Sequence, residues 1–519
     1  MPETILVVTA LLVLGLGVSI PKARLLITAA TILGGLIAAA AILVFPVDVN
    51  LLHGMVVLDP LARIFKLVIL GLGLVAVVFA SESFPKIHFA ESLALILFGT
   101  IGMMLLVGTE DLLMIFVALE LTSIPLYILA AFDKESRSSA EAGLKYFLIG
   151  SVSAAFLLYG LSLIYGVAGS TSLSVIAKLS GSPDPLLIAG IVLTLAGFAF
   201  KVAAVPFQLW APDVYEGAPT AAAALIASGS KVAGVFILAK LLTAGLGHWA
   251  GSAGWAQFLP GWAPVIALMA AASIVLGNIT ALVQSNVKRL LAYSAIAHGG
   301  YILLGLCSAK ADSLTAVLFY VVIYALTTAG AFGVVAIVEK QRGGSRLGDF
   351  DGLAKSSPVL ALCLLVFLIS LGGIPPFVGF FGKFYLFTSA LENGQHLWLV
   401  IVAIAMNAVS LYYYLIVLKH AFVLAGPDDI RPANAPASQT LVAALALAVL
   451  ALGIAPGLLL APLTKQDSRL SDSIYKTNKM EAQHISLFEI KPPKKLTRLF
   501  SWNSLNSVNS VQPSFLSEN

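Results

Sequence analysis

The chain has 519 residues, of which 59% are hydrophobic and only 11% are charged, and its formal net charge is +4. A soluble domain of this length needs far more charge on its surface, so the composition excludes a soluble globular protein. Two cysteines, Cys307 and Cys363, are too few for an iron–sulfur cluster or a four-ligand zinc site. We therefore predict no metal site on this chain, and the absence of any nucleic-acid motif predicts no nucleic-acid partner.

The apolar residues come in runs of about 18 to 25, the length that crosses a hydrocarbon core of roughly 30 Å as a helix. Because lipid cannot satisfy backbone polar groups, such runs must be helical. We predict an all-α polytopic membrane protein with about fourteen transmembrane helices. The predicted spans cover residues 3–20, 26–46, 58–81, 90–108, 111–132, 141–167, 185–206, 219–245, 262–284, 289–308, 313–339, 357–390, 394–424 and 438–462.

The two ends of the chain differ in character. Residues 1–20 lack a basic region and a small-residue cleavage site, so we expect the first span rather than a signal peptide. From 465 to 519 the sequence is polar and rich in Ser and Asn, which predicts a flexible C-terminal tail. The tail is assigned no function.

The basic residues of the loops predict the orientation. Even-numbered loops hold only Lys178 and Lys310. The odd-numbered loops hold Lys22, Arg24, Lys86, Lys134, Arg137, Lys288, Arg289, Lys340, Arg342, Arg346, Lys355, Lys419 and Arg431. By the positive-inside rule the odd loops face the cytoplasm, and both termini are predicted on the non-cytoplasmic side.

Ionisable residues inside the predicted spans are the candidate functional residues, because each such charge costs about 2.5–3.5 kcal/mol near the bilayer centre. They are Glu120, Lys145, Lys201, Lys231, His298 and Lys383. Each has an ordinary structural alternative, which is strongest for two of them. Lys145 is near the start of its span and can reach the headgroups with its long side chain. His298 can equally be a core histidine that is hydrogen-bonded to a neighbouring helix.

Buried Lys and Glu together suit a proton path. Burial disfavours the ionised form of either group, and a nearby opposite charge restores it, so a movement that separates the pair changes their proton affinities. Prolines add a second indication: Pro206 follows Lys201 by five residues, and Pro375–Pro376 precede Lys383. Proline disrupts the helical hydrogen-bond ladder. Two broken helices, each with a buried lysine, predict the duplicated halves of a transporter-like fold.

Three stretches resemble a known family. Residues 200–220 read FKVAAVPFQLWAPDVYEGAPT, residues 284–301 read QSNVKRLLAYSAIAHGGY, and residues 372–387 read GGIPPFVGFFGKFYLF. They resemble the antiporter-like membrane subunits of NADH-quinone oxidoreductase (respiratory complex I), and WAPDVYEGAP resembles the N subunit in particular. The resemblance runs from about residue 1 to 462, so the tail departs from the family pattern.

The resemblance implies two inverted five-helix repeats with broken helices. Residues 1–89 would form helices 1–3, residues 90–245 and 262–424 the two repeats, residues 438–462 helix 14, and residues 465–519 the tail. It also implies that Glu120 and Lys201 form a coupling pair, that Lys231 and His298 relay protons, and that Lys383 serves the exit side. Lys145 matches an additional lysine typical of N subunits.

The resemblance further implies a translocase subunit without a redox centre. FMN, iron–sulfur clusters and quinone would be carried by partner subunits, and the chain itself would bind no cofactor. Its partners would be the lipid bilayer and the other membrane subunits of complex I, in a bacterial-type inner membrane or an equivalent energy-converting membrane. The alternatives are a subunit of a multisubunit cation/proton antiporter or of a membrane-bound hydrogenase, a structural scaffold, and a solute carrier whose lysines bind an anion.

Overall fold

The structure is a computed structural model of the chain. It describes residues 1–20, 22–46, 49–51, 54–84, 88–179, 184–255, 258–308, 311–391, 396–426 and 435–464. The predicted tail at 465–519 lies outside the described residues. So do Lys86, Lys310 and Arg431, three of the basic residues that predict the orientation.

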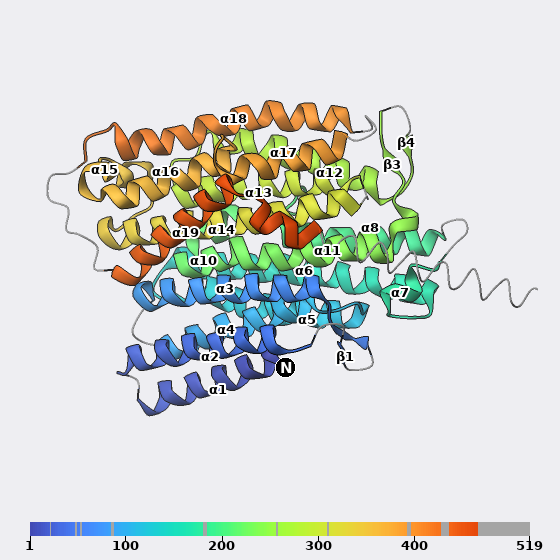
Figure 1. Cartoon of the computed structure of the whole chain (residues 1–519), viewed down its shortest axis with the longest axis horizontal. Helices are drawn as coiled ribbons and strands as arrows, with labels where there is room; N and C mark the ends of the chain where they lie inside the picture. The colour runs from blue at the N-terminus through green and yellow to red at the C-terminus, as the bar shows by residue number, and fades with distance from the viewer. Residues whose placement is uncertain are drawn as a thin grey trace, which may run out of the picture. The chain divides into compact units, whose positions relative to one another are not determined.

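Long α-helices run side by side through the described part of the chain (Figure 1). The first half contains α1 (Pro2–Ser19), α2 (Arg24–Val44), α3 (Pro60–Ser83), α4 (Phe89–Val107), α5 (Leu112–Ala130), α6 (Arg137–Ala168), α7 (Leu173–Ile176), α8 (Pro185–Val202), α9 (Trp210–Gly217), α10 (Thr220–Leu225), the π-helical η2 (Ile226–Ser230), α11 (Lys231–Lys240), the π-helical η3 (Leu241–Gly245) and the 3-10 helix η4 (Gly247–Trp249). The second half contains α12 (Trp262–Ala281), α13 (Val287–Leu306), α14 (Ala311–Arg342), the 3-10 helix η5 (Leu347–Phe350), α15 (Leu353–Ser356), α16 (Pro358–Gly372), α17 (Val378–Leu391), α18 (Leu397–Phe422) and α19 (Pro436–Ile454).

Strands are confined to two small hairpins in the described loops. β1 (Val49–Leu51) pairs antiparallel with β2 (Val56–Leu58), and β3 (Ser252–Ala253) pairs antiparallel with β4 (Phe258–Leu259). An all-α membrane fold is therefore confirmed.

Each of the fourteen predicted spans corresponds to a helix or to a broken pair of helices. Twelve helices in the described residues are long and apolar enough to cross a membrane. The predicted tenth span is α13, whose first turn contains Lys288 and Arg289. The predicted twelfth span is divided into the shorter helices α16 and α17. The predicted boundaries differ from the observed ones mainly where a helix ends at a break.

Short polar residues fix several helix starts at the expected positions. Asp59 accepts a hydrogen bond from the Ala62 amide at the start of α3, and Asp111 accepts two from the first turn of α5. Asn286 caps α13 in the same way. Such caps satisfy amides that have no partner within their own helix, typically stabilising the helix by about 1 kcal/mol.

Two breaks divide the transmembrane helices where the prolines predict them. α8 ends at Val202, and Ala203 turns into the left-handed region (φ +57) before a cis peptide bond that joins Val205 to Pro206. α16 ends at Gly372, and Gly373 is also left-handed (φ +78) before a cis bond joins Pro375 to Pro376. The two halves of the chain thus contain the same kind of interruption.

Glycine is favoured at position 373, which leads to a first prediction. A side chain at φ +78 is strained by roughly 1–2 kcal/mol, and a Cβ there would lie 2.9 Å from Cδ of Lys383. We expect Gly373→Ala to lower the unfolding temperature of the purified protein. Gly71→Ala is the matched control, because Gly71 is helical and nothing lies within 4 Å of its Cβ position. Equal unfolding temperatures for the two variants would contradict this interpretation of the break.

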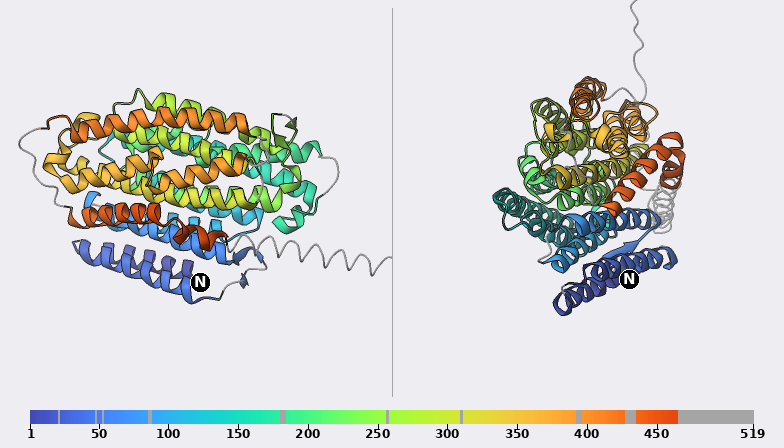
Figure 2. Two further views of the ribbon diagram at one scale, coloured as in Figure 1. Left: turned by 45° about the horizontal axis from the view of Figure 1, so that its top comes forward. Right: turned by 90° about the vertical axis from the view of Figure 1, so that its left-hand side faces the viewer.

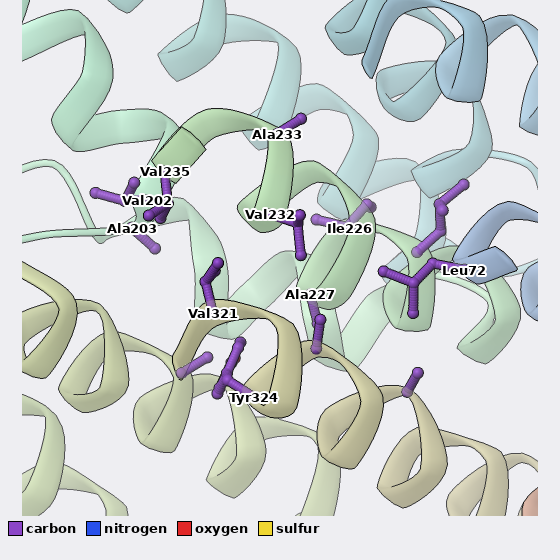
Figure 3. Close-up of a cluster of buried hydrophobic side chains, with 14 of the residues drawn as sticks. Leu72, Val202, Ala203, Ile226, Ala227, Val232, Ala233, Val235, Val321 and Tyr324 are labelled. Carbon is purple, nitrogen blue, oxygen red and sulfur yellow. The ribbon is translucent and has the colours of Figure 1, made fainter. Parts of the chain in front are cut away.

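Two helical segments form the centre of the bundle. In the most apolar stretch of Thr220–Gly245 every residue is buried, and in the corresponding stretch of α14 94% of the residues are buried. In α1, α2 and α18 only about a third of the residues in such a stretch are buried. Figure 3 shows apolar side chains from α8, η2, α11 and α14 meeting at this centre, among them Val202, Ile226, Val232 and Val321. Viewed end-on, α1 and α2 lie at one edge of the bundle and α18 lies near the opposite edge (Figure 2). Lys231 and Tyr324 belong to the two central segments.

Candidate functional site

The predicted site residues differ in burial. Lys201, Lys231, His298 and Lys383 are each 5% exposed or less, and they lie around the central helices. Glu120, on α5, is partly buried. Lys145 differs, because its side chain is 39% exposed. The structure brings the first four residues into a connected interior region and places Lys145 elsewhere.

Lys201 lies in the last turn of α8, directly before the first break. Its Nζ donates a hydrogen bond to Oγ of Ser123 on α5 (3.0 Å). Glu120, one turn earlier on α5, acts on Lys201 electrostatically, and no direct ion pair joins the two among the described residues. Gly234 on α11 permits the close approach, since a Cβ there would lie 2.9 Å from Cγ of Lys201. The pair therefore has opposite charges within range but not in contact.

Hydroxyl groups connect this pair to the next lysine. The Tyr127 hydroxyl interacts with Ser123, and the Tyr127 ring packs edge-on against Tyr146 with centroids 4.7 Å apart. The Tyr146 hydroxyl in turn interacts with Ser230, the residue before Lys231. A polar and aromatic path thus runs from α5 to the start of α11.

Lys231 begins α11, directly after the π-helical turn η2. Its Nζ donates to the backbone carbonyl of Ala295 on α13 (2.6 Å) and lies 5.0 Å from the centre of the Tyr324 ring. Neutral acceptors therefore hold this ammonium group. Burial of an ammonium group without a carboxylate partner is costly.

His298 lies on α13 between the lysines of the two halves. Its Nδ1 is hydrogen-bonded to the Tyr320 hydroxyl (2.6 Å), and its Nε2 is hydrogen-bonded to the Tyr414 hydroxyl (3.2 Å). Both Lys231 and Lys383 act on it electrostatically. In a neutral imidazole one nitrogen donates and the other accepts, so an exchange of tautomer moves a proton across the ring.

Lys383 lies on α17, after the second break. Its Nζ donates to the Leu371 carbonyl (2.6 Å) and to Oδ1 of Asn407. The Leu371 carbonyl is among the last of α16, where the broken helix leaves acceptors without intrahelical partners. Nζ also lies 5.1 Å from the centre of the Tyr301 ring. The break therefore supplies the acceptor that holds the lysine.

Several members of this network are absent from the predicted set. Tyr413 donates to Oδ1 of Asn278 (3.0 Å), and Nδ2 of Asn278 donates to the Tyr301 hydroxyl (3.3 Å). The Tyr414 hydroxyl is hydrogen-bonded to Ser294 (2.5 Å). Asn278 and Asn407 are uncharged polar residues in mid-span, which is the signal that could have identified them. The tyrosines carry no such signal, since they are common in apolar helices.

Lys145 belongs to an ion-pair network at one end of the bundle. Its Nζ contacts Asp213 (2.6 Å) and Glu141 (2.5 Å), and Asp213 also binds Arg289 (2.6 Å), which contacts Glu216. Burial raises the pKa of the Asp213 carboxyl, but hydrogen bonds from Lys145 and Arg289 outweigh this effect and hold that pKa below its ordinary value. The placement fits the alternative in which Lys145 extends toward the polar boundary.

Two further charge clusters escaped sequence analysis. Lys66 on α3 and Glu3 on α1 form an ion pair (2.6 Å) whose side chains are 2% and 6% exposed. At the end of α11, Lys240 contacts Asp59 (3.2 Å) and Glu110 (2.9 Å). Both clusters join separate helices, and neither contains a predicted site residue.

No group of three or more His, Cys, Asp or Glu residues within the described ranges is placed to hold a metal ion. The functional groups that meet at the centre are amines, one imidazole, hydroxyls and amides. Such groups can accept and release protons.

Residues 109–408 match the profile of the NADH:quinone oxidoreductase/Mrp antiporter transmembrane family. The chain is 48% identical over 440 residues to NADH-quinone oxidoreductase subunit N 2 of Acidobacterium capsulatum, covering 82% of this chain and 89% of that protein. It is 40% identical over 469 residues to subunit N of Trichlorobacter lovleyi, covering 88% and 93%. The chain belongs to the NADH-quinone oxidoreductase subunit N family.

Solved structures share the fold, and one of them is a chain of respiratory complex I. A chain of respiratory complex I from Thermus thermophilus with bound aureothin has 34% identity and a TM-score of 0.76, covering 89% of this chain and 99% of that one. A chain of the archaeal membrane-bound sulfane sulfur reductase has 25% identity and a TM-score of 0.81, covering 90% and 96%. The Mrp complex of Dietzia sp. matches at 22% identity and a TM-score of 0.76, covering 91% and 97%, which supports the fold alone.

Proposed function

We propose that this subunit N moves protons across an energy-converting membrane, driven by electron transfer in other subunits of an NADH-quinone oxidoreductase. The observation that supports this proposal is a buried row of proton-exchanging groups, which runs from Lys231 past Tyr324 and His298 to Lys383. It joins the two halves of the chain through the middle of the bundle. A scaffold has no need to bury two lysines on neutral acceptors, because each burial costs stability.

Each residue has a role in this proposal. Glu120 and Lys201 are the coupling pair: approach and separation of their charges would change the proton affinity of Lys201. Lys231 receives the proton, His298 passes it between the Tyr320 and Tyr414 hydroxyls, and Lys383 releases it. Lys145 is proposed to stabilise the ion-pair network with Asp213 rather than to join this row.

The matched breaks favour a duplicated architecture. We assign residues 90–245 and 262–424 to two inverted repeats, flanked by residues 1–89 and 438–462. One broken helix with a left-handed residue and a nearby lysine lies in each repeat. By the positive-inside rule, we expect α10 and α13 to begin at the cytoplasmic side and both chain termini to lie on the opposite side.

Redox chemistry belongs to partner chains in this proposal. The relatives are named as subunits of NADH-quinone oxidoreductase, so FMN, iron–sulfur clusters and quinone are expected on other subunits of the complex. The identity to subunit N proteins, 40–48%, exceeds the 22% identity to the Mrp chain, which favours the oxidoreductase over a cation/proton antiporter.

The coupling pair provides the test. We expect Lys201→Met and Glu120→Gln each to lower NADH-driven acidification of inverted membrane vesicles roughly tenfold, because each removes one charge of the pair. Lys22→Met is the control, since Lys22 is an exposed surface residue. Acidification should be followed with a pH-sensitive dye, and assembly with the amount of complex recovered. Unchanged pumping in both variants would refute the proposed function.

A further inference from the structure

A polar cleft of about 720 Å³ opens at the end of the bundle where α10, α13 and α14 meet. Charged and polar groups line it, including Lys288, Glu339 and Thr220. The cleft lies beside loops whose basic residues, such as Arg342 and Arg346, predict the cytoplasmic side. None of the six predicted site residues lines it.

An ion pair lies at the inner wall of this cleft. Nζ of Lys288, whose side chain is 7% exposed, contacts Oε1 of Glu339 at 3.0 Å. The same Nζ lies 3.3 Å from the Ala218 carbonyl and 3.4 Å from Oγ1 of Thr220. Thr220 in turn donates a hydrogen bond to Glu339. These contacts join the first residue of α10 to the last turns of α14.

A seam between two packed helices leads inward from these contacts. The continuous segment α10–η2–α11 packs along α14. At one end of the seam Thr220 meets Glu339, and at the other end Lys231 lies over the Tyr324 ring. Eleven residues separate Thr220 from Lys231, about 16 Å of helix. The seam therefore runs directly from the cleft to the central lysine.

α10 carries small residues on all of its faces. Ala221, Ala222, Ala223 and Ala224 are all buried, so the face that packs on α14 is made of small side chains too, and Ala227 follows in the π-helical turn (Figure 3). Alanine side chains present little bulk to displace, so a slight separation of the helices would admit water. The π-helical turn also interrupts the regular hydrogen-bond ladder just before Lys231, and such turns are frequent at functional sites.

Two buried hydroxyl groups on α14 interact with each other. The Tyr324 hydroxyl interacts with Oγ1 of Thr328, and neither is hydrogen-bonded to any other group in the described part of the protein. The pair is therefore an isolated polar step in otherwise apolar surroundings. Thr328 and Glu339 are eleven residues apart, three turns, and therefore lie on one face of α14. Tyr324 is one turn further toward Lys231.

We propose that this seam is the route by which protons from the cytoplasmic cleft reach Lys231, with the Lys288–Glu339 ion pair as its gate. The inference rests on the proposed function. Glu339 takes a proton from water when its contact with Lys288 opens. The proton then passes through water admitted to the seam. The hydroxyls of Thr328 and Tyr324 each accept one proton and release another, and the neutral amine of Lys231 receives it.

Substitution of one hydroxyl tests the route. We expect Thr328→Val to lower NADH-driven proton pumping in inverted vesicles roughly tenfold, because valine keeps the shape and removes the relay group. Thr328→Ser should pump at the wild-type rate. Thr31→Val is the matched control, since Thr31 is equally buried but bonds only to the Ile27 carbonyl of its own helix. Wild-type pumping by Thr328→Val would overturn the route.

Chemical access from one side gives an independent test. In a chain with Cys307→Ala and Cys363→Ala, we expect Thr328→Cys to react with a small water-soluble thiol reagent added to the cytoplasmic face during turnover. Ala329→Cys, at the same depth on another face of α14, should react at least about tenfold more slowly. Equal rates, or reaction only from the opposite face, would overturn the route.

The two proposals can fail separately. If Lys231→Met stops pumping and Thr328→Val does not, the proposed function stands and the seam is not the route. If neither substitution affects pumping, the proposed function itself fails.

Discussion

Replacing Lys383 with methionine should lower NADH-driven proton pumping roughly tenfold or more. Methionine has a similar length and suits a buried apolar position, but it carries no proton. Nζ of Lys383 is the only ammonium group among the described residues that contacts Leu371 and Asn407. Its loss removes the last proton-carrying group of the row. The measurement is dye-monitored acidification of inverted vesicles.

Two controls separate loss of the proton carrier from loss of structure. Lys383→Met leaves the Leu371 carbonyl and the Asn407 amide without their lysine, a penalty of about 1–3 kcal/mol for each buried group. The amount of assembled complex and its unfolding temperature should therefore be measured with every preparation. Lys22→Met should pump normally. Normal pumping by assembled Lys383→Met would show that protons do not leave through this lysine.

The second large effect is expected on stability. Lys66→Met leaves the Glu3 carboxylate buried without its counter-charge, and removal of one partner of a buried ion pair costs about 3–5 kcal/mol. The pair joins α1 to α3, so its loss should loosen the N-terminal edge of the bundle. The measurement is the unfolding temperature of the purified complex, together with protease sensitivity of the N-terminal helices.

A double substitution makes this prediction specific. Glu3→Leu combined with Lys66→Met removes both charges, and apolar replacement of a complete buried pair is often neutral. The double variant should therefore recover most of the stability that Lys66→Met loses. If the double variant is as unstable as the single one, the loss comes from packing and not from the unpaired carboxylate.

Most of the fold could be predicted from the sequence, because membrane spans have a strong signal of length and polarity. The breaks after Lys201 and before Lys383 were predicted from their prolines, and the structure confirms both. The short helices α7, α9 and α15 were missed, since helices of four to eight residues in loops leave no periodic pattern. The short strands were missed for the same reason.

The site was predicted less completely than the fold. A charge in mid-span identifies Lys201, Lys231 and Lys383, because burial of a charge is expensive. Which groups then hold each lysine depends on contacts between helices far apart in the chain. Ser123, Ala295, Leu371 and Asn407 serve this purpose, two of them through backbone carbonyls. A backbone carbonyl that accepts a hydrogen bond from a lysine has no sequence pattern that sets it apart from other carbonyls.

Lys145 illustrates the limit of the mid-span rule. Its position in the sequence suggested membrane depth, but α6 begins at Arg137 and is 32 residues long. The helix is longer than the stretch of about 20 residues that crosses a hydrocarbon core, and Lys145 lies about two turns from its start with Asp213 and Glu141. Only about 20 residues of a long apolar helix can lie within the hydrocarbon core. A charge near the end of a longer helix is therefore not evidence of a position deep in the membrane.

The most direct test of the central claim is the number of protons moved per NADH oxidised by a complex that carries Lys231→Met. Lys231 joins the coupling pair to His298, so every proton in this account passes it. We predict that this ratio, or the oxidation rate coupled to it, falls roughly tenfold while the complex remains assembled. A wild-type ratio at a wild-type oxidation rate would show that the buried row is not the path of the proton.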